Sequence, residues 1–297
     1  MKPAIALLQE LRPKQWTKNL LLFAGLVFSR HATEGDRVLR ATLAFILFCA
    51  LSSVVYLIND IMDLEADRKH PLKKNRPLAS GAVSVRVALV TAAVLGFGGL
   101  VGCFALNLRF GILALCYIAL MTAYSLRLKH MVILDLLIVA VGFVMRAVGG
   151  IWAIEYPGEQ IPITPWFLTC VLFLALFISI CKRRHELLLL TDTATSHRPV
   201  LDDYSPPLLD QMVSVSTSAT VLSYALYVTI GVRPEAVRHQ QYMIFTLPFV
   251  LYGIFRYLYL VYKCDKGGAP EALLLQDVPM IVNILLWLAA MMYIFYG

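Results

Sequence analysis

The sequence predicts an all-α polytopic membrane protein, and three observations support this fold class. Hydrophobic residues make up 59% of the 297 residues and charged residues only 15%, whereas about 25% of the residues in a soluble domain are charged. The mean hydropathy is +0.73. The apolar residues form about nine runs of membrane-spanning length, which favours one bundle of transmembrane helices over residues 1–297.

Short polar segments separate the expected spans, which lie at about 16–33, 39–59, 83–106, 108–126, 131–154, 163–182, 206–232, 240–262 and 273–296. The first span is the least apolar, although Pro13 and the aromatic Trp16 fit a helix that begins at the membrane interface. Six cysteines lie in or beside the apolar runs without paired spacing, so we expect neither disulfides nor a cysteine metal site.

The distribution of lysine and arginine predicts the orientation in the membrane. With the N-terminus inside, 17 of the 26 basic residues fall in inside segments and six in outside segments, which is the bias of cytoplasmic loops. An odd number of spans then places the C-terminus outside. Two long inside loops, at about 60–82 and 183–205, are expected to cover a site at the cytoplasmic end. Because most of the net charge of +7 lies in such loops, it does not indicate nucleic-acid binding.

The most informative stretch runs from Asn59 to Asp67 and reads NDIMDLEAD. Helical spacing of three and four places Asp60, Asp63 and Asp67 on one face, at the end of an apolar run and beside a basic segment. Oxygen ligands of this kind suit Mg²⁺, which usually bridges to substrate phosphates. A solvated acidic helix end is the alternative, but acidic residues at membrane depth usually mark a functional site.

Further polar residues are expected on the same side of the membrane, after spans two, four and six and within span five. Arg146 follows Asp135 by eleven residues, so the two share a helix face. Each group has an alternative: the basic residues as topology signals or lipid head-group contacts, Asp135 with Arg146 as a structural pair, and Tyr124 as an interfacial tyrosine. Taken together, an acidic face, several cations and a membrane interface predict Mg²⁺-assisted transfer between a phosphorylated water-soluble substrate and a lipid.

The sequence resembles the UbiA-type intramembrane prenyltransferase superfamily over essentially its whole length. The resemblance is carried by Arg12-Pro13, Asn59-Asp60-x-x-Asp63-x-x-x-Asp67, Asn75-Arg76-Pro77-Leu78 with Ser80-Gly81, and Tyr124-Ser125 to Lys129. It implies nine helices around a central cavity that opens toward the membrane, with the two inner loops over its polar end.

One motif departs from the usual family pattern. Typical members carry a second aspartate-rich motif after span six, where this chain has Cys181-Lys182-Arg183-Arg184-His185-Glu186. Cations at that place favour a bare phosphate over a second metal-bound diphosphate. With the segment from Arg12 to Asn19, the departure resembles the decaprenyl-phosphate phosphoribosyltransferase branch. That resemblance implies transfer of 5-phosphoribose from phosphoribosyl diphosphate (PRPP) to a polyprenyl (decaprenyl) phosphate, giving the precursor of the arabinose donor in bacteria with arabinogalactan walls.

The residues and the resemblance together define the expected site. The expected catalytic residues are Asp60, Asp63, Lys129 and Asp135; the expected substrate-binding residues are Lys14, Lys18, Asn59, Arg76, Tyr124, Arg146, Lys182, Arg183, Arg184 and Glu186; and the expected metal ligands are Asp60, Asp63, Asp67 and Asn59. The expected cofactor is Mg²⁺, and the expected partners are PRPP and a polyprenyl phosphate in a bacterial plasma membrane, with a homo-oligomer left open.

Two alternative functions remain open at this point. A prenyltransferase that moves a prenyl group from its diphosphate to an aromatic acceptor would use the same first acidic motif. A transporter or lipid-binding protein without enzymatic activity would place its intramembrane charges along a pathway. The clustering of the charges at one end of the bundle is less typical of a pathway through the membrane.

Overall fold

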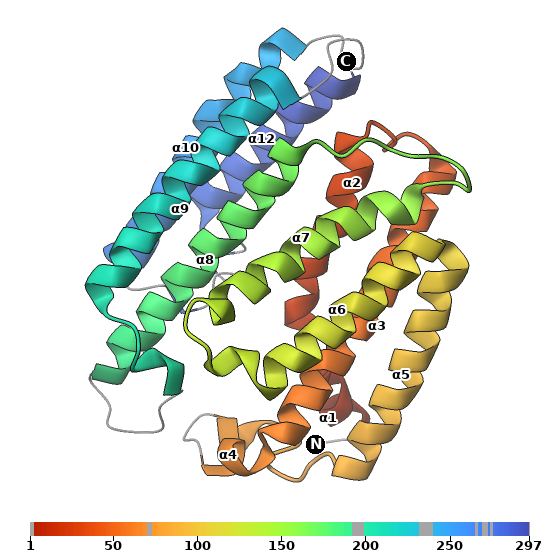
Figure 1. Cartoon of the computed structure of the whole chain (residues 1–297), viewed down its shortest axis with the longest axis vertical. Coiled ribbons are helices and arrows are strands. Elements are labelled where there is room, and N and C mark those ends of the chain that lie inside the picture. Colours follow the sequence, from red (N-terminus) through yellow and green to blue (C-terminus); the bar gives the residue numbers. More distant parts are fainter. Residues whose placement is uncertain are drawn as a thin grey trace. The chain divides into compact units, whose positions relative to one another are not determined.

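Figure 1 shows the structure, a computed structural model that describes residues 3–69, 73–191, 199–231, 240–264, 267–268, 273 and 276–296. Every regular element within these residues is a helix. The described residues form two compact units, the first from 3–138 and 145–161 and the second from 139–144, 162–191 and 199–296. The prediction of a single domain stays a prediction.

The first unit contains a long central helix, α3, and the shorter elements packed around it. Its elements are α1 (Pro3–Glu10), η1 (Pro13–Leu21), α2 (Leu22–Phe28), α3 (Gly35–Met62), α4 (Leu64–Lys69), η2 (Lys73–Asn75), α5 (Val85–Leu106), α6 (Leu108–Leu126), η3 (Leu128–His130) and most of α7 (Leu134–Ile154). Two of the helix starts are capped by side chains. Ser84 accepts a hydrogen bond from the backbone N–H of Val87, and Asn107 accepts from Arg109 and Phe110.

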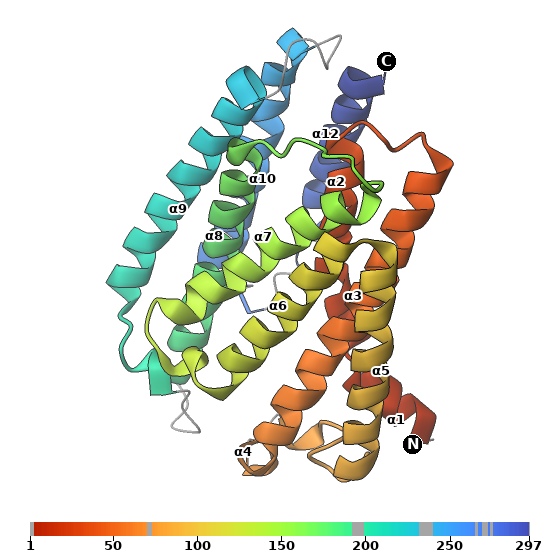
Figure 2. The same cartoon turned by 45° about the vertical axis from the view of Figure 1, so that its right-hand side comes forward.

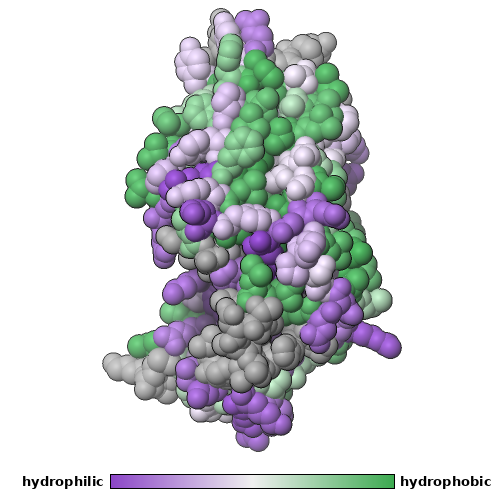
Figure 3. All heavy atoms as spheres, turned by 90° about the vertical axis from the view of Figure 1, so that its left-hand side faces the viewer, coloured by the Kyte–Doolittle hydropathy of each residue, from purple (hydrophilic) through white to green (hydrophobic). Residues whose placement is uncertain are grey.

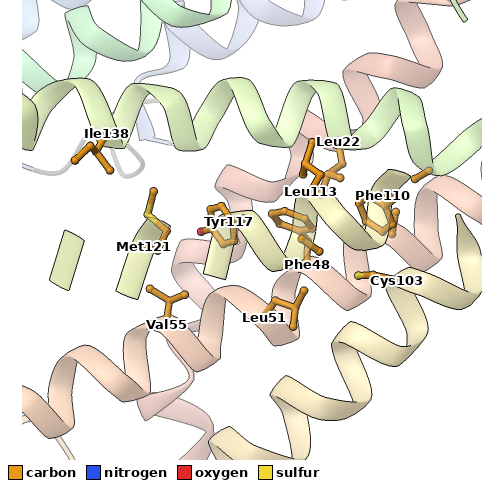
Figure 4. Packing of buried hydrophobic residues seen from close by; sticks show 13 residues of the cluster. Leu22, Phe48, Leu51, Val55, Cys103, Phe110, Leu113, Tyr117, Met121 and Ile138 are labelled. Carbon is orange, nitrogen blue, oxygen red and sulfur yellow. The ribbon is translucent and has the colours of Figure 1, made fainter. Parts of the chain in front are cut away.

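The core of the first unit lies where α3 meets α6 (Figure 4). The ring of Phe48 on α3 lies 5.9 Å from that of Phe110 and 4.9 Å from that of Tyr117, measured between centroids. All three side chains are buried. Aromatic pairs at such distances contribute beyond the area that they bury, so this contact holds α3 and α6 together in the middle of the unit.

The amino end of α3 is held by two arginines. Arg40 donates hydrogen bonds to the carbonyl oxygens of Leu106, Ala153 and Glu155, at 2.6, 3.0 and 3.0 Å, and so satisfies the carboxyl ends of α5 and α7. Arg37 donates to Glu34 and Glu159. Hydrogen bonds to His31 and Arg37 lower the pKa of Glu34, and a hydrogen bond from Arg37 lowers the pKa of Glu159.

The second unit consists of long helices with short helical turns at their ends. Its elements are α8 (Pro165–Thr191), η4 (Pro199–Leu201), α9 (Pro206–Leu226), the π-helical η5 (Tyr227–Gly231), η7 (Gln240–Thr246), α10 (Leu247–Tyr262) and α12 (Val278–Tyr296). Their buried polar groups are paired: the Tyr224 hydroxyl lies 2.6 Å from that of Thr246 and accepts a hydrogen bond from Trp287 at 2.9 Å. Such pairing is required of polar groups removed from water.

Eight described helices are long and apolar enough to cross a membrane, and they correspond to predicted spans two to nine. They are Gly35–Met62, Val85–Leu106, Leu108–Leu126, Leu134–Ile154, Pro165–Leu188, Pro206–Ile230, Gln241–Tyr262 and Val278–Tyr296. The first predicted span, 16–33, is instead the 3₁₀ helix η1 followed by the seven-residue α2. Its polar residues explain the difference, because Asn19 is buried against Ser52 of α3 rather than exposed to lipid.

The predicted inner loops are also shorter than the sequence indicated. Helix α3 continues to Met62, into the first predicted loop. Helix α8 continues to Thr191, so the first part of the predicted loop 183–205 is helical. Residues 192–198 of that loop lie outside the described residues. Figures 1 and 2 place α1, α4 and the carboxyl end of α3 at the same end of the first unit.

Exposed apolar side chains cover much of the helix surface. On α5, Val94 and Phe97 are 65% and 77% exposed, and on α9 Val215 is 69% exposed. Figure 3 shows hydrophobic side chains over much of the face that it presents, with hydrophilic ones gathered mainly in the lower part. A helix surface of this composition is stable against lipid and would be unusual in water.

Close packing of α2 on α7 depends on a glycine. A Cβ atom on Gly150 would lie 2.0 Å from the carbonyl oxygen of Leu22. We therefore expect Gly150→Ala to lower the free energy of unfolding by about 1–3 kcal/mol, the usual range for overpacking. Thermal unfolding of the purified protein in detergent measures the change. Gly98→Ala is the control, because nothing lies within 4 Å of its added Cβ; equal stability of the two variants would contradict this account of the contact.

Candidate active site

The acidic stretch is divided by the end of α3. The helix ends at Met62, Asp63 follows with φ −88° and ψ 6°, and α4 begins at Leu64. The backbone N–H of Asp63 still donates to Asn59, and that of Asp67 to Asp63. The break nevertheless turns the carboxylates toward different partners. Arg76 nevertheless binds both Asp60 and Asp67, and the prediction that Asp60, Asp63 and Asp67 share one face stays a prediction.

Asp60 lies between two guanidinium groups. Nη2 of Arg12 donates to both of its oxygens, at 2.6 and 2.7 Å, and Nη1 of Arg76 donates to Oδ1 at 3.0 Å. Asp60 is only 2% exposed. A buried carboxylate is stable only when it is paired and hydrogen-bonded, so the two arginines allow an acidic residue at this depth.

The backbone at Arg12 is shaped to bring its side chain to Asp60. Arg12 has φ 54° and ψ 60°, a left-handed conformation uncommon outside glycine. Pro13 follows it and disfavours the right-handed helical conformation at the preceding residue. The guanidinium also lies 5.0 Å from the centroid of the Tyr56 ring, a distance at which a cation is attracted to the aromatic face.

Asp67 shares Arg76 with Asp60. Nη1 of Arg76 donates to Oδ2 of Asp67 at 2.5 Å, and Nζ of Lys73 lies 3.9 Å from Oδ1. Asp67 is buried, whereas Arg76 is partly exposed. One guanidinium therefore joins the last turns of α3 to α4 through two carboxylates.

Asp63 is bound from a third segment of the chain. Nζ of Lys129, in η3 after α6, donates to both of its oxygens at 2.8 and 2.9 Å. The side chain of Asp63 is 31% exposed and that of Lys129 is 13% exposed. This ion pair connects the carboxyl ends of α3 and α6. Tyr124, five residues before Lys129, is partly buried and packs against the core between these helices.

Glu10 is a buried carboxyl group next to this cluster. It is the last residue of α1 and is 2% exposed. Its Oε2 accepts a hydrogen bond from the backbone N–H of Leu78 at 3.2 Å. Burial and the neighbouring Asp60 carboxylate raise the pKa of Glu10 to about 7. The sequence analysis gave no indication of this residue.

Arg146 has structural partners in the first unit. Its Nε donates to Oδ1 of Asn19 at 2.8 Å, and its Nη2 donates to the Tyr117 hydroxyl at 2.6 Å. Asn19 in turn donates to Ser52 of α3 at 3.1 Å. Asp135 is fully buried near the start of α7. Eleven helical residues span about 16 Å, so the shared face of Asp135 and Arg146 does not make them neighbours along α7.

The two lysines of η1 lie on the surface side of that helix. Lys14 is exposed and its carbonyl oxygen accepts a hydrogen bond from Thr17, while Lys18 is partly buried. Their role in binding substrate stays a prediction. The backbone oxygen of Asn59 accepts a hydrogen bond from the N–H of Asp63. The role of Asn59 in binding metal or substrate also stays a prediction.

The basic motif of the second unit lies within α8 rather than in a loop. Nη1 of Arg183 donates to Glu186 at 2.6 Å. Nε of Arg184 donates to Asp210 of α9 at 2.5 Å, and its guanidinium lies 4.1 Å from the ring centroid of Tyr262. Tyr262 also donates to Asp210, at 2.7 Å. Arg184 thus joins α8, α9 and α10. Lys182, two residues earlier in α8, is partly buried.

The comparisons with known proteins agree with these features. Residues 20–283 match the profile of the UbiA prenyltransferase family. The chain belongs to this family. It is 34% identical to the decaprenyl-phosphate phosphoribosyltransferase of Mycolicibacterium smegmatis, over 95% of this chain and 90% of that protein. It is also 34% identical to the protein of that name from Corynebacterium glutamicum, over 96% of this chain and 85% of that protein. The family and these relatives show that the protein is a transferase. The family and the eight apolar helices show that it is a multi-pass membrane protein.

Solved structures show the same fold. A UbiA homolog from Archaeoglobus fulgidus bound to GPP and Mg²⁺ has a TM-score of 0.71 and 21% identity, covering 98% of this chain and all of that one. The apo structure of a homolog from Aeropyrum pernix K1 has a TM-score of 0.66 and 16% identity, covering 93% of this chain and 97% of that one. These likenesses confirm the predicted all-α UbiA-like fold.

The carboxylates of this UbiA-family chain are paired with its own cations. Within the described residues, no group of three or more Asp, Glu, His or Cys side chains is arranged to hold a metal ion. The donor chemistry nevertheless fits Mg²⁺, because Asp60, Asp63 and Asp67 supply the hard oxygen ligands that this ion prefers. Arg12, Arg76 and Lys129 occupy positions next to these oxygens.

Sequence reasoning missed several residues that build the site. Arg12 was noted only as part of a family motif, and Asn19 only as part of the N-terminal segment. Their partners, Asp60 and Arg146, lie 48 and 127 residues away. The available signals were a charged residue next to Pro13 and a polar residue, Asn19, in a weakly apolar run, but neither signal identifies a partner.

Arg146 is expected to act on structure rather than on substrate. Tyr117→Phe removes a hydrogen bond to a buried guanidinium, and we expect it to lower the free energy of unfolding by about 1–3 kcal/mol. The KM for substrates should change little. Thermal unfolding and initial rates in detergent test this, with the exposed Tyr252→Phe as control. Unchanged stability together with a raised KM would instead place Arg146 at the substrate.

Proposed function

We propose that this transferase moves 5-phosphoribose from PRPP to a polyprenyl phosphate and releases diphosphate. The observation that supports it is the cluster at the carboxyl end of α3, where Asp60, Asp63 and Asp67 are each bound by Arg12, Arg76 or Lys129. A site that holds three carboxylates and three cations together can accept both a metal ion and phosphate oxygens. The names of the relatives support decaprenyl phosphate as the acceptor and a phosphoribosyl group as the part transferred, and PRPP as the donor is part of the proposal.

The reaction exchanges one bond at the anomeric carbon of the ribose. The bond between C1 and the diphosphate oxygen breaks, and a bond between C1 and an oxygen of the lipid phosphate forms. Positive charge develops at C1 as in other glycosyl transfers. Because the lipid phosphate is already an anion, it needs no strong general base. The protein contributes by positioning the two substrates and excluding water.

Asp60, Asp63 and Asp67, with Asn59, are the proposed ligands of Mg²⁺. The ion, when bound, neutralises the charge of the departing diphosphate. Arg12, Arg76 and Lys129, which bind the carboxylates in the structure, would then be available to bind phosphate oxygens. A guanidinium suits this exchange, because it binds carboxylate and phosphate in the same bidentate geometry.

The remaining cations are candidates for the other phosphate groups. Lys14, Lys18, Lys182 and Arg183 with Tyr124 are proposed to contact the ribose 5-phosphate or the lipid phosphate. The catalytic role of Asp135 and the substrate-binding role of Glu186 stay predictions, whereas Arg146, which is bound to Asn19 and Tyr117, is expected to act on the structure. Arg184 is the weakest candidate, since Asp210 and Tyr262 hold it within the second unit.

Prenyl transfer is the second candidate function. The family description, UbiA prenyltransferase, favours it, and the first acidic cluster would serve a prenyl diphosphate equally well. The basic motif Lys182–Arg184 favours the phosphoribosyl reaction, because a second metal site would need carboxylates there. The non-enzymatic alternative is not supported, since the relatives are transferases.

The identity of the product distinguishes the two candidate reactions. Purified protein in detergent with Mg²⁺ should move radiolabel from PRPP into the lipid phase only when polyprenyl phosphate is present. Parallel reactions with prenyl diphosphate and an aromatic acid provide the comparison. If label stays in water while the aromatic acid becomes prenylated, the phosphoribosyl proposal is wrong and the prenyl reaction is correct.

The acidic cluster should be essential for turnover. Asp60→Asn or Asp63→Asn removes a charged ligand, and we expect a rate loss of at least about 10²-fold, the size of one lost electrostatic contact in a transition state. A chelator should abolish activity and Mg²⁺ should restore it. Asp36→Asn, at the other end of α3 and exposed, is the control. Normal rates for both cluster variants at normal protein levels would remove these residues from the mechanism.

The proposed location is a bacterial plasma membrane with the site on the cytoplasmic side, so that PRPP reaches it from the cytoplasm. Reporter fusions near Lys74 or Asp192 should be cytoplasmic and a fusion after Gly297 extracytoplasmic, because inside segments carry most of the basic residues. Activity of each fusion with a periplasmic and a cytoplasmic reporter measures this. Reversed signals at the two inner positions would overturn the orientation.

A further inference from the structure

Glu10 connects the two chain segments that carry the arginines of the site. It lies two residues before Arg12, and its hydrogen-bond donor, Leu78, lies two residues after Arg76. Both arginines donate to Asp60. The Glu10–Leu78 hydrogen bond is thus a direct contact between the segments that place the two guanidiniums.

Both segments are also anchored to α3 or to the core, so the Glu10–Leu78 hydrogen bond joins two segments that each have a fixed attachment. The carbonyl oxygen of Leu11 accepts a hydrogen bond from Ser53 of α3 at 2.9 Å. The side chain of Leu78 is buried in a cluster with Ala6, Leu57 and Val83. Backbone hydrogen bonds from Arg76 to Lys73 and from Ser80 to Arg76 make the intervening turn compact.

A carboxyl group is a costly choice for stability at this position. Glu10 is almost fully buried, and its second oxygen, Oε1, has no hydrogen-bond donor among the described residues. Burying a polar group that is only partly hydrogen-bonded costs free energy. An apolar side chain of similar size would avoid this cost, so the carboxyl group has to be explained by what it holds in place.

We propose that Glu10 is a positioning residue, which holds the segment Arg76–Leu78 so that Arg76 meets Asp60 and Asp67 and can receive the diphosphate of the substrate. The inference rests on the proposed function in assigning a diphosphate to this site. Glu10 itself touches no substrate. It acts on Arg76 through Leu78 and on Arg12 through the chain, and it also lies beside the Asp60 carboxylate that both arginines bind.

Two substitutions distinguish the effect of the hydrogen-bond acceptor of Glu10 from the effects of its charge and its side-chain volume. Glu10→Gln keeps an oxygen that can accept the Leu78 N–H, whereas Glu10→Met keeps the volume and removes the acceptor. Binding of inorganic diphosphate with Mg²⁺ is measured by calorimetry on the full chain in detergent, beside the KM for PRPP and for polyprenyl phosphate. We expect Glu10→Met to weaken diphosphate binding and to raise the KM for PRPP about tenfold, the effect of one lost hydrogen bond of ~1.4 kcal/mol.

The other readouts should not move in the same way. The KM for polyprenyl phosphate should stay within about twofold. The melting temperature of Glu10→Met should stay close to that of the parent, because the cost of leaving the Leu78 N–H without an acceptor is offset by removing a partly satisfied buried carboxyl group. Glu10→Gln should bind diphosphate nearly as well as the parent. A purely structural role would lower stability and affect all substrates alike.

Glu155 provides the matched control. It is also 2% exposed, and its Oε1 accepts a hydrogen bond from the backbone N–H of Ile161 at 2.9 Å. It lies beside the amino end of α3, through its carbonyl contact with Arg40, and so far from Asp60. Glu155→Met should leave diphosphate binding unchanged. If Glu10→Met and Glu155→Met weaken it equally, or if Glu10→Met binds diphosphate normally, the proposal is overturned.

A double-mutant cycle tests whether Glu10 acts through Arg76. In an Arg76→Gln background, Glu10→Met should add less than twofold to the loss of diphosphate binding, and an additive tenfold loss would contradict the proposal. Because diphosphate is a part of both PRPP and a prenyl diphosphate, these binding results hold whichever transfer the enzyme catalyses. Failure of the phosphoribosyl assay with a positive cycle would therefore refute the proposed function alone.

Discussion

The structure of the first unit depends on the carboxylate of Asp60. A buried negative charge at the end of a membrane helix requires a cation. Two guanidiniums supply it, one from Arg12, before α3 in the sequence, and one from Arg76, after it. This requirement explains the left-handed backbone at Arg12 and the compact turn around Arg76. Segments with little apolar surface of their own are thereby fixed at the end of α3. Ion pairs hold the segments together at this end of α3, whereas close packing of apolar side chains holds the helices together in the middle of the unit.

The carboxylates and cations also show how one set of residues can serve two states. In the structure, the acidic groups and the basic groups neutralise each other. In the proposed reaction, exchange of these partners for a metal ion and a phosphate would conserve the number of ion pairs, so the desolvation cost of the charges would be met in both states. Because one arginine binds both Asp60 and Asp67, the two carboxylates would change partners together.

Sequence patterns predicted the long helices well, because a run of about 20 apolar residues has few other uses. The same patterns could not predict where α3 ends. Asp63 follows Met62 without a glycine or proline, and its carboxylate is turned by Lys129, 66 residues later. The spacing correctly predicted that the acidic residues lie at one end of the helix, but it could not predict which cations bind them.

The burial of Glu10 could not be predicted, since a single glutamate next to a basic segment is normally solvated. The contact that buries it comes from a backbone N–H, which carries no sequence signal.

The short element η1–α2 has a consequence for how the chain enters the membrane. Its buried polar groups are satisfied by α3: Trp16 donates to Ser53, and Asn19 donates to Ser52. Without α3 these groups would face hydrocarbon unpaired, which costs several kcal/mol for each group. Helix α3, with 28 residues, is in contrast long and apolar enough to cross a membrane by itself. We therefore expect α3 to insert first during biogenesis and the N-terminal segment to pack against it afterwards.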